Sequence, residues 1–375
     1  MRSALLAFAL LALVPATAAA DDLVVKGRGW GHGVGLSQYG AYGYALREGR
    51  DHRFILAHYY TGTSYGTAPG RRIRVRLKRA RAPRLSGASI ARAANGRRVR
   101  LTEARTYRFR ALSSNRVKVI DTSSGRTRAR LLAPVRVTGG ATTTLRGTAE
   151  NGLSNGAYRG TMVLARDRGS VLAVNRISLE RYLYGVIAAE MPSSWPAEAL
   201  KAQAVVARSY ALRSIRPDSP YDVFADVRSQ VYNGVGAETS ATTAAVRSTG
   251  ARVVRAGDEV AQTFFFSTSG GRTASNEEGF GGTPLSYLRS VDDPHDDLSP
   301  HHTWTARFSE REANRKLRTV VLGDLRSIDV ASRTPSGRAA TVHVRGSGGD
   351  RTVSAATVRT LLGLRSTWIT SATGP

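Results

Sequence analysis

The sequence predicts an α+β fold. Residues 70–157 form short runs that alternate apolar and polar side chains and are separated by turns of Gly, Ser, Asn and Pro, which is typical of strands. Residues 158–368 combine apolar stripes at helical spacing with further strands at 261–267 and 340–345. One stretch is therefore all strand and the other is mixed, so we expect a mixed helix and strand core with a small β module inserted into it.

The expected elements begin with a glycine-rich segment near the N-terminus, which leads into a helix over residues 37–48. In the β module, apolar and polar residues alternate most clearly at 73–77, 99–101 and 117–120. Two helices then follow within residues 179–213. A chain of 375 residues can hold two domains, or one large domain with an insertion.

The first of these two helices carries a carboxylate on its apolar stripe. The stripe follows the spacing i, i+3, i+4, i+7 and i+8, through Leu179, Tyr182, Leu183, Val186 and Ile187. Its next two places are Glu190 and Met191, and Pro192 disfavours helix at the residue before it, so the helix should end there. Burial and the negative end of the helix dipole both raise the pKa of Glu190, as a general acid at neutral pH requires. The alternative is a structural Glu paired with one of the many arginines.

The second helix carries the rival carboxylate, Glu198. This residue lies in the first turn, where the positive end of the helix dipole lowers the pKa, so it suits an anchor or an electrostatic partner better than an acid. The same alanine-rich helix carries four further polar candidates for substrate binding or support of the site: Lys201, Gln203, Arg208 and Tyr210. Its small residues favour tight packing, so we expect Gln203 and Arg208 to be buried polar supports.

Composition restricts the functional classes. The formal net charge is +27 and the pI is about 11.3. Either the charge attracts a polyanion such as an anionic wall polymer, or it reflects high-GC coding, because fifty arginines stand against five lysines. No aromatic-rich stripe accompanies the charge, so we predict no nucleic-acid partner. The absence of cysteine excludes disulfides, zinc-thiolate sites and cysteine nucleophiles.

The N-terminus reads as an export signal. Arg2 precedes an apolar run over residues 5–14 and small residues at 16–20, which predicts a signal peptide over 1–20 and a secreted, extracellular protein. The run is short for a membrane helix, and an uncleaved anchor is the alternative. No later stretch reaches membrane-spanning length, so we expect no transmembrane helix in the mature chain.

Two glycine-containing segments, around His32 and at Ser269, each have a functional and a structural explanation. The glycine block around His32 lacks the spacing of a phosphate-binding loop, but its glycines allow close backbone approach, which suits the wall of a sugar-binding cleft. His32 and Gln38 would then bind the sugar or orient Glu190, and a structural turn is equally compatible with the pattern. The same two readings apply to the loop at Ser269 and Gly270.

Metal and serine chemistry are not favoured. Loop 292–302 holds four aspartates and three histidines, and its spacing matches neither an EF-hand nor a helical zinc motif. We therefore predict no metal and no cofactor, with a zinc or calcium site in this loop as the alternative. The G-x-S-x-G string at 152–156 lies in a polar loop without the strand-to-helix setting of a nucleophile elbow.

These motifs together resemble the SpoIID/LytB family of cell-wall proteins. The resemblance rests on Glu190-Met191-Pro192, Trp195-Pro196, residues 198–204 (EALKAQA) and 207–211 (ARSYA), Asp226, Gln230, Tyr232, Gly234, and residues 267–273, 358–359 and 362–367. The block at residues 31–41 (GHGVGLSQYGA), which contains Ser37, also belongs to the family. The resemblance implies a SpoIID/LytB core domain over residues 158–368, with 70–157 as an inserted β-rich module.

One feature departs from the family pattern. The GHGVG block usually closes the domain, whereas here it is N-terminal. Either residues 26–66 fold back to complete the core in a permuted order, or they form a separate module.

The resemblance implies a lytic transglycosylase acting on peptidoglycan glycan strands between N-acetylmuramic acid and N-acetylglucosamine, with Glu190 as general acid and base. A single carboxylate suffices because the nucleophile is a hydroxyl of the substrate, whereas ordinary glycosidases use two carboxylates. The resemblance makes the remaining matched polar residues candidates for substrate binding or support: His32, Ser37, Gln38, Glu198, Lys201, Gln203, Arg208, Tyr210, Gln230, Tyr232, Ser269 and Gly270. The family also contains amidase enhancers, so a non-catalytic binder that stimulates a wall N-acetylmuramoyl-L-alanine amidase is the alternative.

Overall fold

The computed structural model describes residues 22–374, so the predicted signal peptide at 1–20 lies outside the described residues. The described chain forms two compact units. The smaller contains residues 22–27 and 304–374, and the larger contains residues 28–303. Within residues 22–374, no helix is both long enough and apolar enough to cross a membrane.

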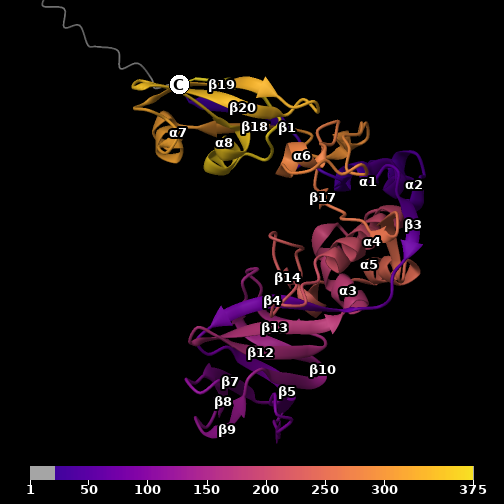
Figure 1. Ribbon diagram of the computed structural model, residues 1–375, viewed down its shortest axis with the longest axis vertical. Coiled ribbons are helices and arrows are strands. Elements are labelled where there is room, and N and C mark those ends of the chain that lie inside the picture. Colours follow the sequence, from indigo (N-terminus) through magenta and orange to yellow (C-terminus); the bar gives the residue numbers. More distant parts are fainter. Residues whose placement is uncertain (1–21, 375) are drawn as a thin grey trace, which may run out of the picture. The chain divides into compact units, whose positions relative to one another are not determined.

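The smaller unit contains two three-stranded sheets and two helices (Figure 1). One sheet has the order β18 (Thr303–Phe308), β1 (Leu23–Arg28), β22 (Ile369–Thr373), so the two ends of the described chain pair side by side. The other joins β19 (Leu325–Arg333), β20 (Ala339–Gly346) and β21 (Gly349–Ser354). Helices α7 (Glu310–Leu317) and α8 (Ala355–Leu362) contribute Ala313, Leu317 and Val358 to its core.

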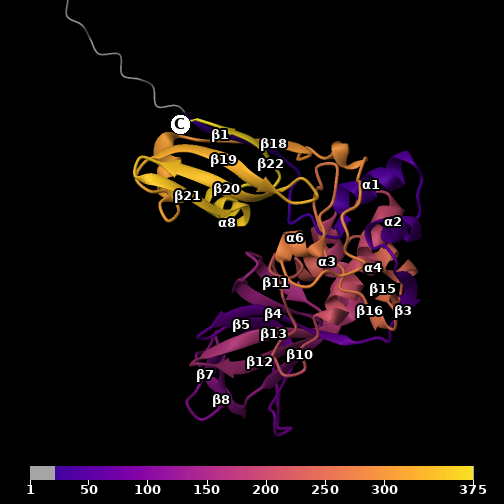
Figure 2. The ribbon, with the colours of Figure 1, turned by 45° about the horizontal axis from the view of Figure 1, so that its top comes forward.

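An eleven-stranded sheet dominates one end of the larger unit, as Figures 1 and 2 show. Its strands are β4 (Arg72–Ala80), β5 (Arg84–Arg92), β6 (Arg98–Arg100), β7 (Thr106–Ala111), β8 (Arg116–Asp121), β9 (Thr127–Leu132), β10 (Val135–Thr148), β11 (Ser154–Tyr158), β12 (Thr161–Asp167), β13 (Ser170–Ser178) and β14 (Val223–Phe224). The main path runs β14-β4-β13-β12-β10-β5-β7-β8-β9, with β11 on β10 and β6 on β5. Strand β4 alternates buried apolar and more exposed basic residues, as predicted for 73–77.

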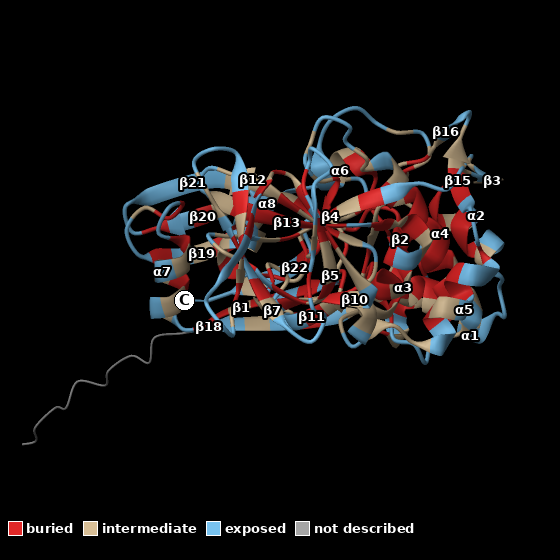
Figure 3. Cartoon of the chain, turned by 90° about the horizontal axis from the view of Figure 1, so that it is seen from below, coloured by how far each residue is buried: buried red, intermediate tan, exposed pale blue. Residues whose placement is uncertain are grey.

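Helices pack beside this sheet and form the other end of the larger unit. They are α1 (Gln38–Arg47), α2 (His52–Tyr59), α3 (Leu179–Glu190), α4 (Ala197–Arg213), α5 (Ser240–Ser248) and α6 (Asn276–Phe280). Figure 3 shows α3 and α4 as largely buried elements. Two clusters of buried apolar residues share α4: one joins it to the sheet and α3, and the other joins it to α1 and α2. The mixture of helices and strands confirms the predicted α+β class.

Short strands link the glycine block to a distant part of the chain. Strand β2 (Leu36–Ser37) pairs in parallel with β17 (Phe265–Phe266), and isolated bridges join Trp30 to Thr268 and Val34 to Ala274. A separate small sheet joins β3 (Ser64–Thr67), β15 (Arg252–Ala256) and β16 (Glu259–Val260). Of the strand predicted at 261–267, only residues 265–266 form a regular strand, β17. The residues before it bond to two different partners: the Ala261 N–H donates to β15, and the Phe264 carbonyl accepts from the N–H of Leu36.

The compact units divide the chain differently from the segments predicted by motifs. The sheet that contains 70–157 continues through β12 and β13, because β4 pairs with β13 along eight residues. Residues 304–368, grouped with 158–303 on sequence, pack in the smaller unit around β1. The identity of each segment as a domain stays a prediction.

Candidate active site

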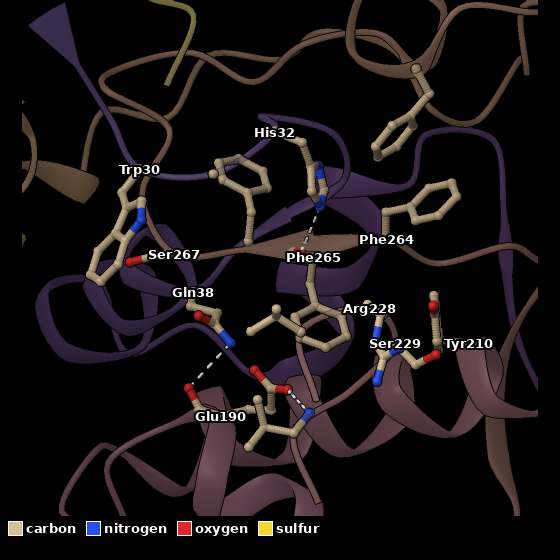
Figure 4. Close-up of a pocket in the computed structure, with 15 residues that line it drawn as sticks. Trp30, His32, Gln38, Glu190, Tyr210, Arg228, Ser229, Phe264, Phe265 and Ser267 are labelled. Carbon is tan, nitrogen blue, oxygen red and sulfur yellow. Dashed lines mark hydrogen bonds between the residues drawn. The ribbon is translucent and has the colours of Figure 1, made fainter. Parts of the chain in front are cut away.

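A pocket of about 500 Å³ opens in the larger unit where five separate segments meet (Figure 4). The segments are the glycine block, the end of α3, α4, the loop after β14, and the region from β17 to α6. The lining residues are Trp30, Gly31, His32, Gln38, Glu190, Tyr210, Val227, Arg228, Ser229, Val231, Phe264, Phe265, Phe266, Ser267 and Phe280. Among the described residues that line it, Glu190 is the one carboxylate.

Glu190 reaches the pocket because α3 ends there. The apolar stripe of α3 is buried, which fixes the rotation of the helix. Glu190 is the last helical residue, and Met191 turns to the extended conformation required before Pro192. The side chain of Met191 is buried beside α4. The last turn of the helix therefore presents Glu190 to the pocket at the point where the chain leaves the helix.

Burial raises the pKa of Glu190 to about 7. Two hydrogen bonds to the carboxyl group partly lower this pKa: one from the backbone N–H of Val231 to Oε1 at 2.8 Å, and one from the Gln38 side chain. Gln38 Nε2 also donates to the backbone carbonyl of Glu190 at 3.2 Å. Figure 4 draws the Val231 bond and this backbone bond as dashed lines. A carboxyl group with this pKa is present in both protonation states near neutral pH, so it can both donate and accept a proton.

No ion pair joins Glu190 to a Lys or Arg within residues 22–374, unlike the structural alternative considered from the sequence. Arg228 lines the same pocket, but its guanidinium donates to Asp226 at 2.6 Å and to Glu150 at 3.3 Å. The guanidinium also lies 3.8 Å from the centroid of the Phe224 ring. Arg228 is therefore held by two other carboxylates, and the charged form of Glu190 is not stabilised by a cation.

The glycine block forms one wall of the pocket through close backbone packing. Gly35 has φ +78°, and a Cβ there would overlap the carbonyl oxygen of Phe264. Between the glycines, His32 accepts from the N–H of Val34 at Nδ1 (3.1 Å), while its Nε2 lies 3.0 Å from the carbonyl oxygen of Phe265. This pattern requires the proton on Nε2. His32 thus fastens the block to β17 and presents its ring to the pocket.

Three of the predicted residues lie in a buried polar cluster instead of lining the pocket. Ser37 caps α1 by accepting from the N–H of Gly40, and Ser269 accepts from the N–H of Gly271. Gly270 donates its N–H to Asp296 at 2.5 Å. Ser37 and Ser269 are fully buried. The structure therefore places Ser37, Ser269 and Gly270 behind the pocket wall.

The centre of this cluster is the buried carboxylate of Asp293. Burial and the neighbouring Asp296 raise the pKa of Asp293 to about 6, and nearby hydroxyl groups partly offset the rise. The Tyr59 hydroxyl donates to Asp293 at 2.8 Å, and His302 Nδ1 lies 2.8 Å from Asp296. The acidic loop thus ties α1, α2 and the Ser269 loop together. Among residues 22–374, no group of three or more His, Asp or Glu side chains is arranged to hold a metal ion.

Glu198 and Lys201 also lie outside the pocket. Glu198 accepts from Lys201 at 2.6 Å and from the backbone N–H of His52 at 2.9 Å, and His52 Nδ1 lies 2.6 Å away. Burial alone raises the pKa of Glu198, but the bonds from Lys201 and His52 hold it at about 2. The pKa of Glu198 is lowered, as predicted, although hydrogen bonds from Lys201 and His52 produce the shift instead of the helix dipole. Glu198 joins α2 to α4.

The other candidates on α4 divide between support and lining. Arg208 is buried, as predicted, and binds Glu180 through two bonds of 2.8 Å and the carbonyl of Arg252 at 3.0 Å. Gln203 is also buried, and its amide has no hydrogen-bond partner within the described chain. Tyr210 lines the pocket itself, with its ring edge-on to Phe264.

Gln230 and Tyr232 position the loop that donates to Glu190. The buried Gln230 accepts from the Tyr182 hydroxyl at 3.1 Å and donates to the carbonyl of Ala207 at 3.3 Å. The Tyr232 hydroxyl donates to Asn175 at 3.0 Å, and its ring packs against Tyr182. These contacts hold the loop on both sides of Val231, whose N–H meets Glu190.

Sequence reasoning missed the apolar rim of the pocket. Three of its side chains are unusually exposed for apolar residues: Val227 at 88%, Phe280 at 51% and Trp30 at 44%. Exposed aromatic groups around a cleft are typical of binding sites. A lone Trp, Val or Phe carries no such signal in the sequence, because only the fold shows that it is exposed beside the pocket.

Comparison with known proteins identifies a matching family model and several relatives of this chain. The stage II sporulation protein (SpoIID) family model matches residues 167–255, which contain α3, α4 and Glu190. Stage II sporulation protein D of Bacillus subtilis (strain 168) is 30% identical over 211 residues, which cover 52% of this chain and 60% of that protein. The Bacillus amyloliquefaciens protein of the same name is 32% identical over 216 residues, covering 53% and 61%.

A third relative carries a different name. The amidase enhancer of Bacillus subtilis (strain 168) is 38% identical over 135 residues, which cover 36% of this chain and 18% of the enhancer. The matches thus span less than two thirds of the length of each relative. The family model matches the segment that carries Glu190, and relatives of both names are similar to this chain, which supports its resemblance to the SpoIID/LytB family.

Proposed function

We propose that the protein is a secreted lytic transglycosylase that cleaves the glycan strands of peptidoglycan, with Glu190 as its general acid and base. The observation that carries the proposal is a single pocket carboxylate whose pKa is raised to about 7. An ordinary glycosidase needs a second carboxylate, as nucleophile or as base for a water molecule. Within the described residues the pocket lining offers none, which favours a reaction whose nucleophile belongs to the substrate.

The proposed reaction moves one proton out of Glu190 and one back. The protonated carboxyl donates to the glycosidic oxygen between N-acetylmuramic acid and N-acetylglucosamine as the bond from that oxygen to the anomeric carbon breaks. The resulting carboxylate takes the proton of the C6 hydroxyl of the same muramic acid while its oxygen bonds to the anomeric carbon. The products are an anhydro-muramoyl end and a free glucosamine hydroxyl. No water is consumed.

The surroundings of Glu190 suit these two roles. The Val231 N–H binds Oε1 in either protonation state and leaves Oε2 to carry the proton. His32 holds the backbone of the pocket wall, whereas Gln38 bonds both the backbone carbonyl and the carboxyl group of Glu190. The exposed rings of Trp30 and Phe280 offer apolar faces on which sugar rings can pack.

The test compares wild type, Glu190→Gln and Glu198→Gln on peptidoglycan with and without stem peptides, with products identified by mass spectrometry. We expect anhydro-muramoyl ends from wild type and from Glu198→Gln, and a loss of about 10²–10⁴-fold in Glu190→Gln, the usual worth of a general acid. Reducing ends would instead require a water-directing group and would refute the transglycosylase assignment.

The second candidate function is non-catalytic stimulation of a wall amidase. It is favoured by the similarity to a protein named amidase enhancer. In that case wild type and Glu190→Gln would both leave glycan strands intact, and both would raise the rate at which a purified amidase removes stem peptides. This outcome would replace the transglycosylase proposal.

A further inference from the structure

Most of the net charge is concentrated in the large sheet of the larger unit. Residues 71–178 contain 26 Lys and Arg against 4 Asp and Glu, whereas the rest of the chain contains 29 against 24. The sheet segment therefore carries +22 of the total +27. An arginine-rich coding bias acts along the whole chain and does not explain why acidic residues are scarce in this segment.

Three cations form a row across neighbouring strands. Arg110 of β7 stands directly opposite Lys118 of β8, and Lys118 stands directly opposite Arg130 of β9. We call Arg110, Lys118 and Arg130 the cationic row. Arg108 and Arg128 lie two residues before Arg110 and Arg130 on the same face and are exposed. Figure 1 shows these strands at the end of the larger unit away from α3 and α4, and Figure 2 shows β7 and β8 there.

No carboxylate of the described residues pairs with the row. Within residues 22–374, none of its three members makes an ion pair or a side-chain hydrogen bond. Two arginines of a groove elsewhere in the sheet differ, because Arg76 binds Glu150 and Arg79 binds Asp167. Like charges directly opposite on adjacent strands are destabilising, so the row opposes the pairing of the strands that carry it. An anionic ligand would remove this repulsion.

The geometry of a sheet defines the ligand. Adjacent strands lie about 4.8 Å apart and alternate residues about 6.8 Å apart, so the face presents a closely spaced grid of positive charges. A guanidinium binds phosphate through two parallel hydrogen bonds. Single-stranded nucleic acids also need aromatic platforms for their bases, but Tyr107 and Phe109 of β7 point into the core. The face fits a flexible phosphate chain without bases.

We propose that the cationic row binds a linear polyol-phosphate polymer, with successive phosphodiesters lying along the row. The proposal goes beyond the transglycosylase and does not depend on it, because no member of the row lines the pocket that contains Glu190. Such binding would hold the protein on the polymer whether or not it cleaves glycan.

The test uses the triple variant Arg110→Gln, Lys118→Gln, Arg130→Gln. Its matched control removes three exposed cations of the smaller unit that make no ion pair within the described chain: Arg311→Gln, Arg318→Gln and Arg326→Gln. Binding of a labelled synthetic glycerol phosphate oligomer is titrated over a series of salt concentrations. Loss of three phosphate contacts should reduce the slope of log K against log salt by about 2, whereas the control keeps the wild-type slope.

The melting temperature separates a binding role from a structural one. Because the row is repulsive, the triple variant should melt at or above the temperature of wild type while binding at least about tenfold less tightly. The proposal is overturned if the triple variant and the control bind equally, if wild type does not bind the oligomer, or if it prefers polyglutamate or single-stranded DNA of equal charge.

Discussion

The raised pKa of Glu190 predicts how stability responds to pH in Glu190→Gln. Folding raises this pKa from 4.5 to about 7, a change worth about 3 kcal/mol at 1.36 kcal/mol per unit. The contribution of Glu190 to stability is fully present below pH 4.5 and is lost as pH rises through about 7. Gln resembles the neutral acid and still accepts from Val231, so the variant should gain up to about 3 kcal/mol over wild type between about pH 4 and about pH 8.

Glu198→Gln provides a control in which the change in stability at neutral pH should have the opposite sign. Folding lowers the pKa of Glu198 to about 2, so its stabilisation is present above the unfolded pKa of 4.5 and is lost as pH falls through about 2. This side chain is partly exposed, so we reduce the expected effect to about 2 kcal/mol. Glu198→Gln should therefore be the less stable protein at neutral pH, and its deficit should shrink in acid.

The assay is urea unfolding followed by the helical circular dichroism signal, with the slope against urea held common to each pair of proteins. The free energies of unfolding of wild type and variant are compared at each pH. A constant difference between Glu190→Gln and wild type across the range would mean that burial leaves this carboxyl with an ordinary pKa. The acid–base argument for Glu190 would then fail, independently of any enzymatic activity.

Three further substitutions test the surrounding structure by urea unfolding. Arg208→Met should cost about 1–3 kcal/mol because the carbonyls of Arg252 and Val246 lose a buried donor, and unchanged stability would contradict that role. Gly40→Ala should cost roughly 1–3 kcal/mol, since its Cβ would overlap the Tyr59 hydroxyl and the Asp293 carboxylate; unchanged stability would show that the helix can shift. Asp293→Asn should gain stability relative to wild type as pH rises through about 6, because Asp293 loses its contribution there, and a pH-independent difference would be the contrary result.

The sequence predicts the placement of Glu190 better than that of the residues around it. The placement of Glu190 can be predicted because two local rules, apolar periodicity and the restriction before Pro192, act within a dozen residues. Val231 and Phe280 come from segments about 40 and 90 residues away, and their place in the pocket depends on the packing of the whole unit. Local sequence patterns do not show which distant segments come into contact.

The glycine-rich motifs illustrate a second limit. Ser269 and Gly270 resemble a ligand-binding loop in sequence, yet their polar groups are used by the buried Asp296 and by the loop itself. Close approach to a ligand and close approach to another part of the chain demand the same residue, glycine. The fold class was predictable because it depends on periodicity summed over many residues, whereas the direction faced by one loop is set by tertiary contacts.

The order of strands in the smaller unit has a consequence for how the chain folds. Strand β1 lies between β18 and β22, so it finds both neighbours only after the final segment of the chain is available. In the larger unit, the N–H of Gly29 donates to the carbonyl of His302 at 3.0 Å, which brings the two ends of that unit together. The 276 residues of the larger unit separate β1 from the rest of the smaller unit, and once they have folded they act as a loop of only a few residues. Shortening the loop by about six doublings of length lowers the entropic cost of closing it by about 4 kcal/mol. The folded larger unit therefore favours assembly of the smaller one.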